Sequence, residues 1–255
     1  MKKRFGFTLA EVLITLGIIG VVAAMTIPTL IANTNSAKFR SQFKKTISTL
    51  NQAGLMAEAQ YDFNYAGVAH ACNATTPGED SPSHDTAERR DTMCSILNGT
   101  LTGQTVATTR QNAPDSSNIK TTQIQTPGNF IYYSLSDGSM VAIPKTFAVT
   151  AENEACTLNV GETIDEGWVT KHTANCLGYI DVNGKTLPNR EVTCSADASG
   201  NTSATEANNA ALTPWAACTV ASDSTHMTDI FPVFFHDATV EPATNAAKAV
   251  LATAK

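Results

Sequence analysis

The hydrophobic pattern divides the N-terminal part of the chain into two stretches. No charged side chain occurs from Val12 to Ile31, and these 20 residues would span about 30 Å as a helix, the hydrocarbon thickness of a bilayer. After Ile31, apolar residues recur at intervals of three and four, which is typical of a helix with one buried face. We therefore predict a transmembrane helix over 7–31 and an amphipathic stalk helix over 32–64. The apolar stripe of the stalk is Phe39, Phe43, Ile47, Leu50, Gly54, Ala57 and Tyr61.

Short apolar runs in the second half of the chain predict β-strands. The first two runs flank Asp137-Gly138, a dipeptide typical of a β-hairpin turn. Antiparallel strands lying on a long helix make an α+β fold. Its head would comprise residues 65–255, with the sheet in about 129–182 and 229–236. Four strands are expected, at 130–135, 139–143, 177–182 and 230–235.

The segment between the stalk and the first strand, residues 67–128, is polar and interrupted by prolines. Such composition is typical of loops. We expect a connecting loop here, with a short helical piece near 87–97.

Charge is distributed unevenly along the chain. Residues 1–50 carry seven Lys or Arg and one Glu, a net charge of +6, so the remainder carries −12 to give the total of −6. An acidic head repels phosphates, which argues against nucleic acid as a partner. Three cations, Lys2, Lys3 and Arg4, precede the apolar span, and basic flanks stay in the cytoplasm. We therefore expect the N-terminus inside and the head outside.

Six cysteines follow the apolar span, on the side expected to be exported. An even count in an exported chain is typical of disulfides, although six cysteines allow several pairings. Spacing favours three pairs of neighbours. A zinc site is the alternative, because His70 precedes Cys72 and His172 precedes Cys176, but no Cys-x-x-Cys spacing supports it. The favoured pairs are Cys72 with Cys94, Cys156 with Cys176, and Cys194 with Cys218.

One acidic side chain, Glu11, lies in the apolar region, one helical turn after Phe7. A carboxylate near the bilayer centre costs about 2.5–3.5 kcal/mol, and less near the interface. Glu11 therefore either reaches the headgroups or meets a cation. Cleavage after Gly6 would give Phe7 a free amine, and a carboxylate can pair with such an amine on a neighbouring subunit. In that case Glu11 is an assembly contact.

This stretch resembles the prepilin-type cleavage and methylation signal of type IV pilins and of type II secretion pseudopilins. The residues that carry the resemblance are Lys-Lys-Arg-Phe-Gly and the following Phe-Thr-Leu-Ala-Glu-Val-Leu-Ile. In that family the prepilin peptidase cuts after the glycine and methylates the new N-terminus. The resemblance implies a leader of residues 1–6, a cut between Gly6 and Phe7, N-methylation of Phe7, and Glu11 as the assembly glutamate.

The same resemblance implies a pilin-like head and a set of partners. These are the lipid bilayer before assembly, the prepilin peptidase, a membrane assembly platform, and the same or homologous pilin subunits in a helical filament. The implied location is the bacterial inner (cytoplasmic) membrane, followed by an extracellular or periplasmic filament.

Three residues within the span weaken its helix. Gly17 and Gly20 lack side chains, which permits close helix packing. Pro28 lacks a backbone donor and should leave the Ala24 carbonyl without its helical bond, giving a kink or a loosened turn. Pilin-like chains have a helix-breaking proline at a similar distance from the cut. We expect the helix from Gly17 to Pro28 to melt partly in a filament.

A second resemblance lies at the end of the third expected strand. Tyr-Ile-Asp-Val-Asn-Gly-Lys at 179–185, then Pro188-Asn189, then Asp-Ile-Phe at 229–231 looks like a C-terminal pattern of bacterial pilin-like proteins. This chain inserts residues 190–228 between the two halves of the pattern. Because the insertion contains two cysteines, we expect a disulfide-closed surface loop.

A calcium site is one interpretation of this region. Some secretion pseudopilins hold calcium in their C-terminal loop, and Asp181, Asn183 and Asp229 offer the oxygen ligands that calcium prefers. The alternative is a tight turn in which Asp and Asn bond to their own backbone. No other cofactor is expected.

No catalytic motif accompanies these features, since the chain has neither Gly-x-Ser-x-Gly nor a glycine-rich phosphate loop. The sequence predicts a structural subunit of a type IV pilus or type II secretion-like filament rather than an enzyme. One alternative is a filament-borne adhesin that binds through 67–128 or 190–228. Another is a soluble protein released by ordinary signal peptidase. Sequence does not distinguish a major pilin, a minor pilin and a pseudopilin.

Overall fold

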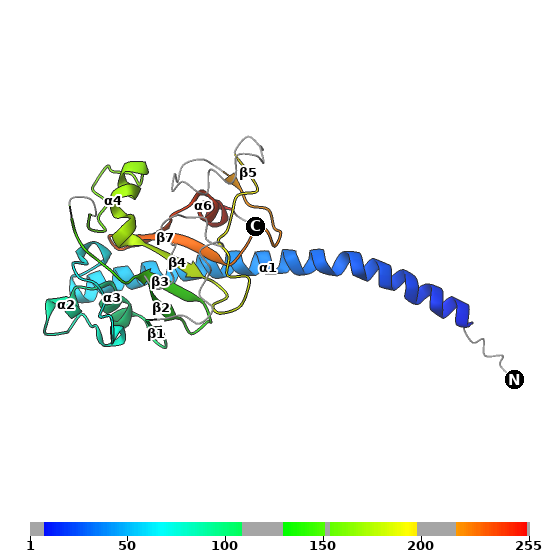
Figure 1. The fold of residues 1–255 in the computed structure, drawn as a ribbon, viewed down its shortest axis with the longest axis horizontal. Coiled ribbons are helices and arrows are strands. Elements are labelled where there is room, and N and C mark those ends of the chain that lie inside the picture. The colour runs from blue at the N-terminus through cyan, green and yellow to red at the C-terminus, as the bar shows by residue number, and fades with distance from the viewer. Residues whose placement is uncertain (1–7, 109–129, 151–153, 198–217, 254–255) are drawn as a thin grey trace.

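The computed structural model describes residues 8–108, 130–150, 154–197 and 218–253. One long helix projects from a head that contains a twisted sheet and shorter helices (Figure 1). This arrangement confirms the predicted α+β, pilin-like fold. The elements in chain order are α1 (Leu9–Tyr61), η1 (Tyr65–Gly67), η2 (Pro77–Glu79), α2 (Ala87–Arg90), α3 (Met93–Thr100), β1 (Thr105–Ala107), β2 (Phe130–Ser134), β3 (Met140–Pro144), α4 (Glu166–Cys176), β4 (Leu177–Asp181), β5 (Ala196–Asp197), β6 (Cys218–Thr219), β7 (Ile230–His236), β8 (Thr239–Pro242) and α6 (Asn245–Ala252).

The transmembrane and stalk segments expected from the sequence form one continuous helix, α1, of 53 residues. It ends at Asp62, whose left-handed backbone (φ 53°) lets its N–H bond to the Glu58 carbonyl. Only its second half is buried in the head. The buried residues of α1 are Ser36, Phe39, Phe43, Thr46, Ile47, Leu50, Ala53, Gly54 and Ala57.

Tyr61, the last residue of the expected apolar stripe, is not buried as the stripe predicted. Its side chain is 36% exposed, and its hydroxyl lies 3.5 Å from the Gly99 carbonyl. The last turn of α1 borders a surface hollow that Pro82 and Asp91 also line. The C-terminal end of α1 therefore lies next to polar loop residues, where its apolar stripe has no strand of the described chain to pack against.

Within the described residues, the main sheet has six strands in the order β1-β2-β3-β4-β7-β8, and every neighbouring pair is antiparallel. The expected hairpin joins β2 to β3, and Gly138 in its turn has φ +87°. A second turn follows β4, where Gly184 has φ +65°. A Cβ on Gly184 would lie 2.4 Å from the Gly138 carbonyl oxygen. Glycine is therefore required where these two turns touch.

Helices cover both faces of this sheet. On one face, Phe43 of α1 stacks on Phe231 of β7 with ring centroids 4.1 Å apart. Trp168 of α4 meets Phe234 of the same strand edge to face, at 5.3 Å. Residues three apart on a strand point to opposite faces. The stalk half of α1 and the helix α4 therefore lie on opposite sides of β7.

The polar segment after the stalk holds more structure than we expected. Two helices, α2 and α3, stand where one helical piece near 87–97 was expected, and β1 adds an edge strand paired with β2. Three residues are too few for an alternating pattern to be recognised. The rest of the expected loop, residues 109–128, lies outside the described part of the chain.

Three further elements went unrecognised. In α4 the buried side chains include His172, Thr173 and Asn175, so no apolar stripe marks the helix. Strand β8 is short and ends in proline. Helix α6 buries mainly alanine and valine, which give a weak signal.

The insertion 190–228 is described only at its two ends. There β5 pairs with β6 in a separate two-stranded sheet, with Ala196 opposite Thr219. Residues 198–217 lie outside the described part of the chain.

Candidate functional site

The N-terminus of α1 is closed by a reciprocal cap between Thr8 and Glu11. The Glu11 N–H donates to Thr8 Oγ1 at 3.3 Å, and the Thr8 N–H donates to Glu11 Oε2 at 2.8 Å. The Thr8 hydroxyl also donates to Glu11 Oε2, at 2.7 Å. The sequence Thr-Leu-Ala-Glu has the spacing of a capping box, a signal that our sequence analysis missed. Gly6 and Phe7 lie outside the described residues.

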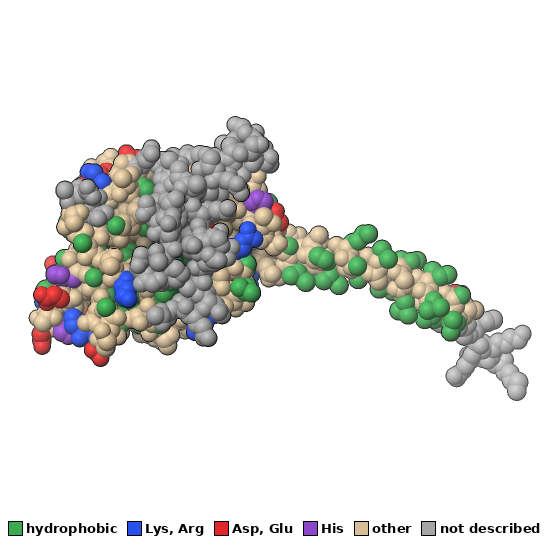
Figure 2. Space-filling model, in the orientation of Figure 1, with side chains coloured by type: hydrophobic (Ala, Val, Ile, Leu, Met, Phe, Trp, Pro, Cys, Tyr) green, Lys and Arg blue, Asp and Glu red, His purple; other side chains and the backbone are tan. Residues whose placement is uncertain are grey.

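The first half of α1 leaves its apolar side chains uncovered. Within the described residues, α1 is the one helix long and apolar enough to cross a membrane, with a mean hydropathy of 2.2 over its most apolar window. Figure 2 shows hydrophobic side chains along the projecting part of this helix. The exposed large residues from 9 to 31 are Leu9, Val12, Leu13, Ile14, Leu16, Ile18, Ile19, Val21, Val22, Met25, Ile27, Leu30 and Ile31.

Threonine hydroxyls in this half are satisfied within the helix. The hydroxyls of Thr15, Thr26 and Thr34 each donate to a backbone carbonyl one turn earlier, at 2.8–3.0 Å. Such bonds let a hydroxyl enter hydrocarbon without an unpaired donor. Threonine is therefore compatible with a membrane-spanning role for this segment.

The three residues expected to weaken the helix lie in its projecting half. A Cβ on Gly17 or Gly20 would have no atom within 4 Å, so both positions face open space in the single chain. The helix continues through Pro28 without a break, and the projecting half curves gently (Figure 1). Partial melting in a filament stays a prediction.

Residues 1–27 match the family described as the prokaryotic N-terminal methylation motif. The chain carries a prepilin-type signal. This signal and the uncovered apolar helix together fit membrane insertion and a surface filament. The signal is typical of structural, non-enzymatic subunits. Comparison with curated proteins and with solved structures gave no match.

The six cysteines downstream of the prepilin signal form the three disulfides that spacing favoured. The Cα atoms of the Cys72–Cys94 pair are 5.6 Å apart, within the usual range for a disulfide. Each bridge closes a local loop, with a sequence separation of 20, 22 or 24 residues. The bridges therefore restrain the loops of the head.

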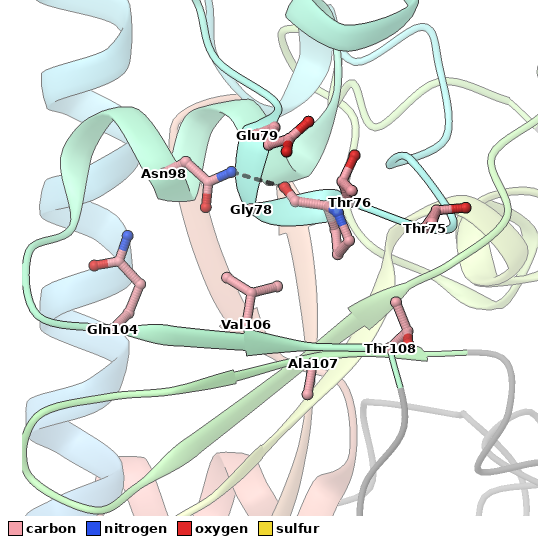
Figure 3. Close-up of a pocket in the computed structure, with 10 residues that line it drawn as sticks. Thr75, Thr76, Gly78, Glu79, Asn98, Gln104, Val106, Ala107 and Thr108 are labelled. Atoms are coloured by element: carbon pink, nitrogen blue, oxygen red, sulfur yellow. Dashed lines mark hydrogen bonds between the residues drawn. The ribbon is translucent and has the colours of Figure 1, made fainter.

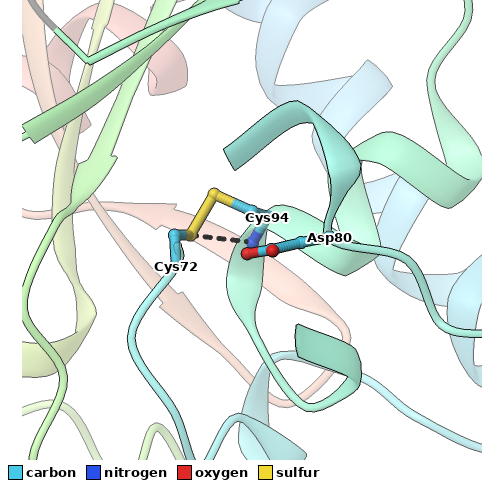
Figure 4. Close-up of side chains that lie close together, drawn as sticks. All are labelled: Cys72, Asp80 and Cys94. Carbon is cyan, nitrogen blue, oxygen red and sulfur yellow. Dashed lines mark hydrogen bonds between the residues drawn. A yellow bond between two sulfur atoms is a disulfide. The ribbon is translucent and has the colours of Figure 1, made fainter. Parts of the chain in front are cut away.

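One disulfide lies beside a buried carboxylate, as Figure 4 shows for Cys72, Cys94 and Asp80. Each offers a potential metal ligand atom within 4.8 Å of the others. Because the two sulfurs are bonded to each other, neither is a thiolate that could bind zinc. Asp80 instead accepts from Arg89 Nε at 3.1 Å and from the Asn73 N–H at 2.9 Å. This group is structural.

The three calcium candidates lie in adjacent turns at one end of the sheet. Both carboxylate oxygens of Asp229 accept backbone N–H groups, from Asn189 and Arg190, each at 2.8 Å. Asp181 Oδ1 accepts the Asn183 N–H at 3.2 Å. Burial raises the pKa of Asp229, against the lowering effect of those N–H donors. The Asp181 contact is the local one of the tight-turn alternative, whereas Asp229 bonds to backbone distant in sequence. Calcium binding stays a prediction.

A polar hollow opens beside the edge strand β1 (Figure 3). Its volume is about 630 Å³. In Figure 3 the side chain of Asn98 reaches toward the Pro77 carbonyl, to which it donates at 2.8 Å, and Gln104 extends from the opposite side. Most of the other lining residues are small or hydroxyl-bearing. They are Thr75, Thr76, Gly78, Glu79, Val106, Ala107 and Thr108.

Proposed function

We propose that this chain is a structural subunit of a type IV pilus or a type II secretion-like filament, as a major pilin, a minor pilin or a pseudopilin. The prepilin peptidase would cut after Gly6 and methylate Phe7, and the subunit would assemble through α1. The observation that carries the proposal is the methylation motif over residues 1–27. An enzymatic role has no support in the sequence motifs.

The uncovered half of α1 supplies the driving force for this role. Its apolar side chains have no cover within the described chain. Covering a large apolar side chain gains about 1.5–3 kcal/mol relative to water. The bilayer supplies that cover before assembly, with the N-terminus in the cytoplasm and the head outside. Neighbouring helices of the same or homologous subunits supply it in the filament, to which the assembly platform delivers them.

Glu11 would change partners between these two states. In the described chain its carboxylate accepts both donors of Thr8. In a filament it would pair with the methylated amine of Phe7 on a neighbouring subunit, which neutralises a charge that apolar surroundings disfavour. Glu11 thus has a capping role that a single chain can fulfil and an assembly role that needs a second copy.

Mass spectrometry of the mature N-terminus tests the processing step. We expect a chain that begins at Phe7 and carries one added methyl group. Gly6→Leu should leave the uncut precursor in the membrane, because the peptidase needs the glycine. A mature chain beginning at Met25 would instead support ordinary signal peptidase and a soluble product.

A pair of variants separates the two roles of Glu11. Glu11→Gln removes the charge, and we expect processed subunits to accumulate in the membrane with few or no filaments. Thr8→Ala removes the capping hydroxyl and keeps the charge, so it should cost about 1 kcal/mol at the helix end and leave filaments abundant. Sheared filaments are counted by electron microscopy. Equal loss in both variants would mean that Glu11 acts as a cap and not as an assembly contact.

A filament-borne adhesin is a second candidate, favoured by the polar hollow beside β1. The hollow lies within the segment 67–128 and is lined by amide and hydroxyl groups, which suit a polar ligand. Gln104→Trp would fill it from the edge strand. If this hollow recognises a surface, the variant should keep its filaments and lose attachment. Unchanged attachment by variant filaments would remove this candidate.

A further inference from the structure

The position of the head along α1 sets its height above a membrane. If residues 12–31 fill the hydrocarbon layer, the headgroup region extends about 5–8 Å farther. The first buried residue of the helix, Ser36, lies five residues beyond Ile31, or about 7.5 Å at 1.5 Å per residue. The base of the head therefore begins where the headgroups end.

Basic side chains gather at this level. Between Glu11 and Glu58, every charged residue of α1 is a Lys or Arg. Two of them are engaged: Lys45 pairs with Asp137 at 2.9 Å, and Lys44 donates to the Thr253 carbonyl at 2.8 Å. Lys38 is exposed and has no acidic partner in the described chain. Its Cα lies about 10 Å beyond Ile31.

A head loop brings an apolar side chain to the hollow that Lys38 lines, and the same loop carries a second cation. Lys38, Thr186 and Leu187 line one hollow of about 240 Å³, where the loop after β4 meets α1. Lys185 precedes Thr186, is exposed, and also has no acidic partner among the described residues. Leu187 is 76% exposed. A cation beside an exposed leucine is an amphipathic pair that suits contact with the outer side of the headgroup layer.

The acidic groups near this hollow do not cancel the two cations. Asp137 lines the hollow and is paired with Lys45. Asp181 and Asp229 are fully buried within the turns above it. Figure 2 shows basic, acidic and histidine side chains where the head meets the projecting helix, and acidic side chains together with basic ones at the opposite end of the head. Among the described residues that line this hollow, Lys38 is therefore left without an acidic partner.

We propose that Lys38, Lys185 and Leu187 form a membrane-facing foot, through which the head rests on the anionic lipid headgroups of the outer leaflet. The contact rests on the proposed anchored state and belongs to the subunit before it enters a filament. An anionic surface favours each nearby Lys by about fivefold in binding. The foot would hold the head upright on the bilayer.

Tryptophan quenching in the full-length protein tests this inference. Leu187→Trp places a reporter in the foot, and Val160→Trp places one in an exposed loop at the opposite end of the sheet, where the neighbouring Leu158 N–H contacts Asp237. Ile19→Trp reports insertion of the span. The three proteins are reconstituted into vesicles of phosphatidylcholine, with or without phosphatidylglycerol, that contain brominated lipid. Trp168 and Trp215 give all three the same background.

We expect quenching at position 187 in anionic vesicles, weaker quenching in phosphatidylcholine alone, and none at position 160. Lys38→Gln and Lys185→Gln should each lower the ratio of docked to undocked heads about fivefold. Lys171→Gln, which removes an exposed cation of α4, should leave it unchanged. High salt should reduce docking, because the charges are screened.

Two results would overturn the proposal while leaving the anchor intact. One is quenching of the Ile19→Trp protein with no difference between positions 187 and 160. The other is quenching at 187 that is indifferent to lipid charge and to both lysines. Crosslinking of position 187 to another copy in place of lipid quenching would identify a subunit contact and also overturn it. An unquenched Ile19→Trp protein would refute the anchored state itself, and the foot with it.

Discussion

Phe43 offers the sharpest test of how α1 joins the head. Its side chain is fully buried and stacks on Phe231 at 4.1 Å with an interplanar angle of 16°. Truncating a buried phenylalanine costs about 3–5 kcal/mol, from lost transfer free energy and the cavity left behind. Because whole domains are stable by only about 5–15 kcal/mol, Phe43→Ala should remove a large share of the free energy of unfolding of the head.

Two variants on the same helix serve as controls. Leu55 is 59% exposed on the far side of the buried half, so Leu55→Ala should change the free energy of unfolding by no more than about 0.5 kcal/mol. Ile18 lies in the uncovered half, and Ile18→Ala should leave head stability unchanged. All three are unfolded by urea as full-length protein in detergent micelles with disulfides intact, followed by tryptophan fluorescence.

The denaturation midpoints decide the issue. If Phe43→Ala falls within about 1 kcal/mol of Leu55→Ala, α1 does not pack into the core as its contacts imply. If Ile18→Ala destabilises the head as much as Phe43→Ala, the two halves of the helix are not energetically separate.

Three further predictions concern the head. Removing one disulfide by Cys72→Ala with Cys94→Ala should cost about 2–4 kcal/mol in urea unfolding, and an unchanged midpoint would mean that the bridge is not formed in the native protein. Burial raises the pKa of Asp229. The extra free energy of unfolding that comes from this raised pKa is therefore fully present below the unfolded pKa of about 3.9. It is lost as the pH rises through the higher pKa of the folded state. Asp229→Asn should remove that decline, and parallel stability-against-pH curves for the two proteins would contradict the assignment. A chelator should leave the thermal midpoint unchanged, because the Asp229 oxygens already accept two N–H groups; a midpoint raised by added calcium would favour the calcium interpretation.

The sequence predicted those parts of the fold in which one physical signal acts alone. The span before Ile31 is marked by its lack of charge, and the buried half of α1 by its period of three and four residues. The hairpin is marked by Asp137-Gly138, because only glycine readily adopts the positive φ found at position 138. These signals are local, so they do not depend on the rest of the chain.

Other features depend on contacts that are distant in sequence. His172 is buried and stacks on Trp168, with ring centroids 4.0 Å apart. A buried polar residue interrupts the apolar pattern by which the sequence would indicate this helix. Strand β8 forms by pairing with β7. Its four residues, which end in proline, have little intrinsic β-strand propensity. The foot could not be inferred from sequence, because Lys38 and Leu187 line one hollow only when the loop after β4 folds against α1.

The division of α1 also constrains how a subunit leaves the membrane. The 13 large apolar residues between Leu9 and Ile31 are all exposed in the single chain. At about 1.5–3 kcal/mol each, moving them from lipid to water would cost about 20–40 kcal/mol. That exceeds the stability of a typical domain, so a free subunit in water is not an accessible intermediate. In the proposed filament, assembly would therefore pass the helix directly from lipid to the helices of other subunits. The head, whose core does not include these residues, would stay folded throughout.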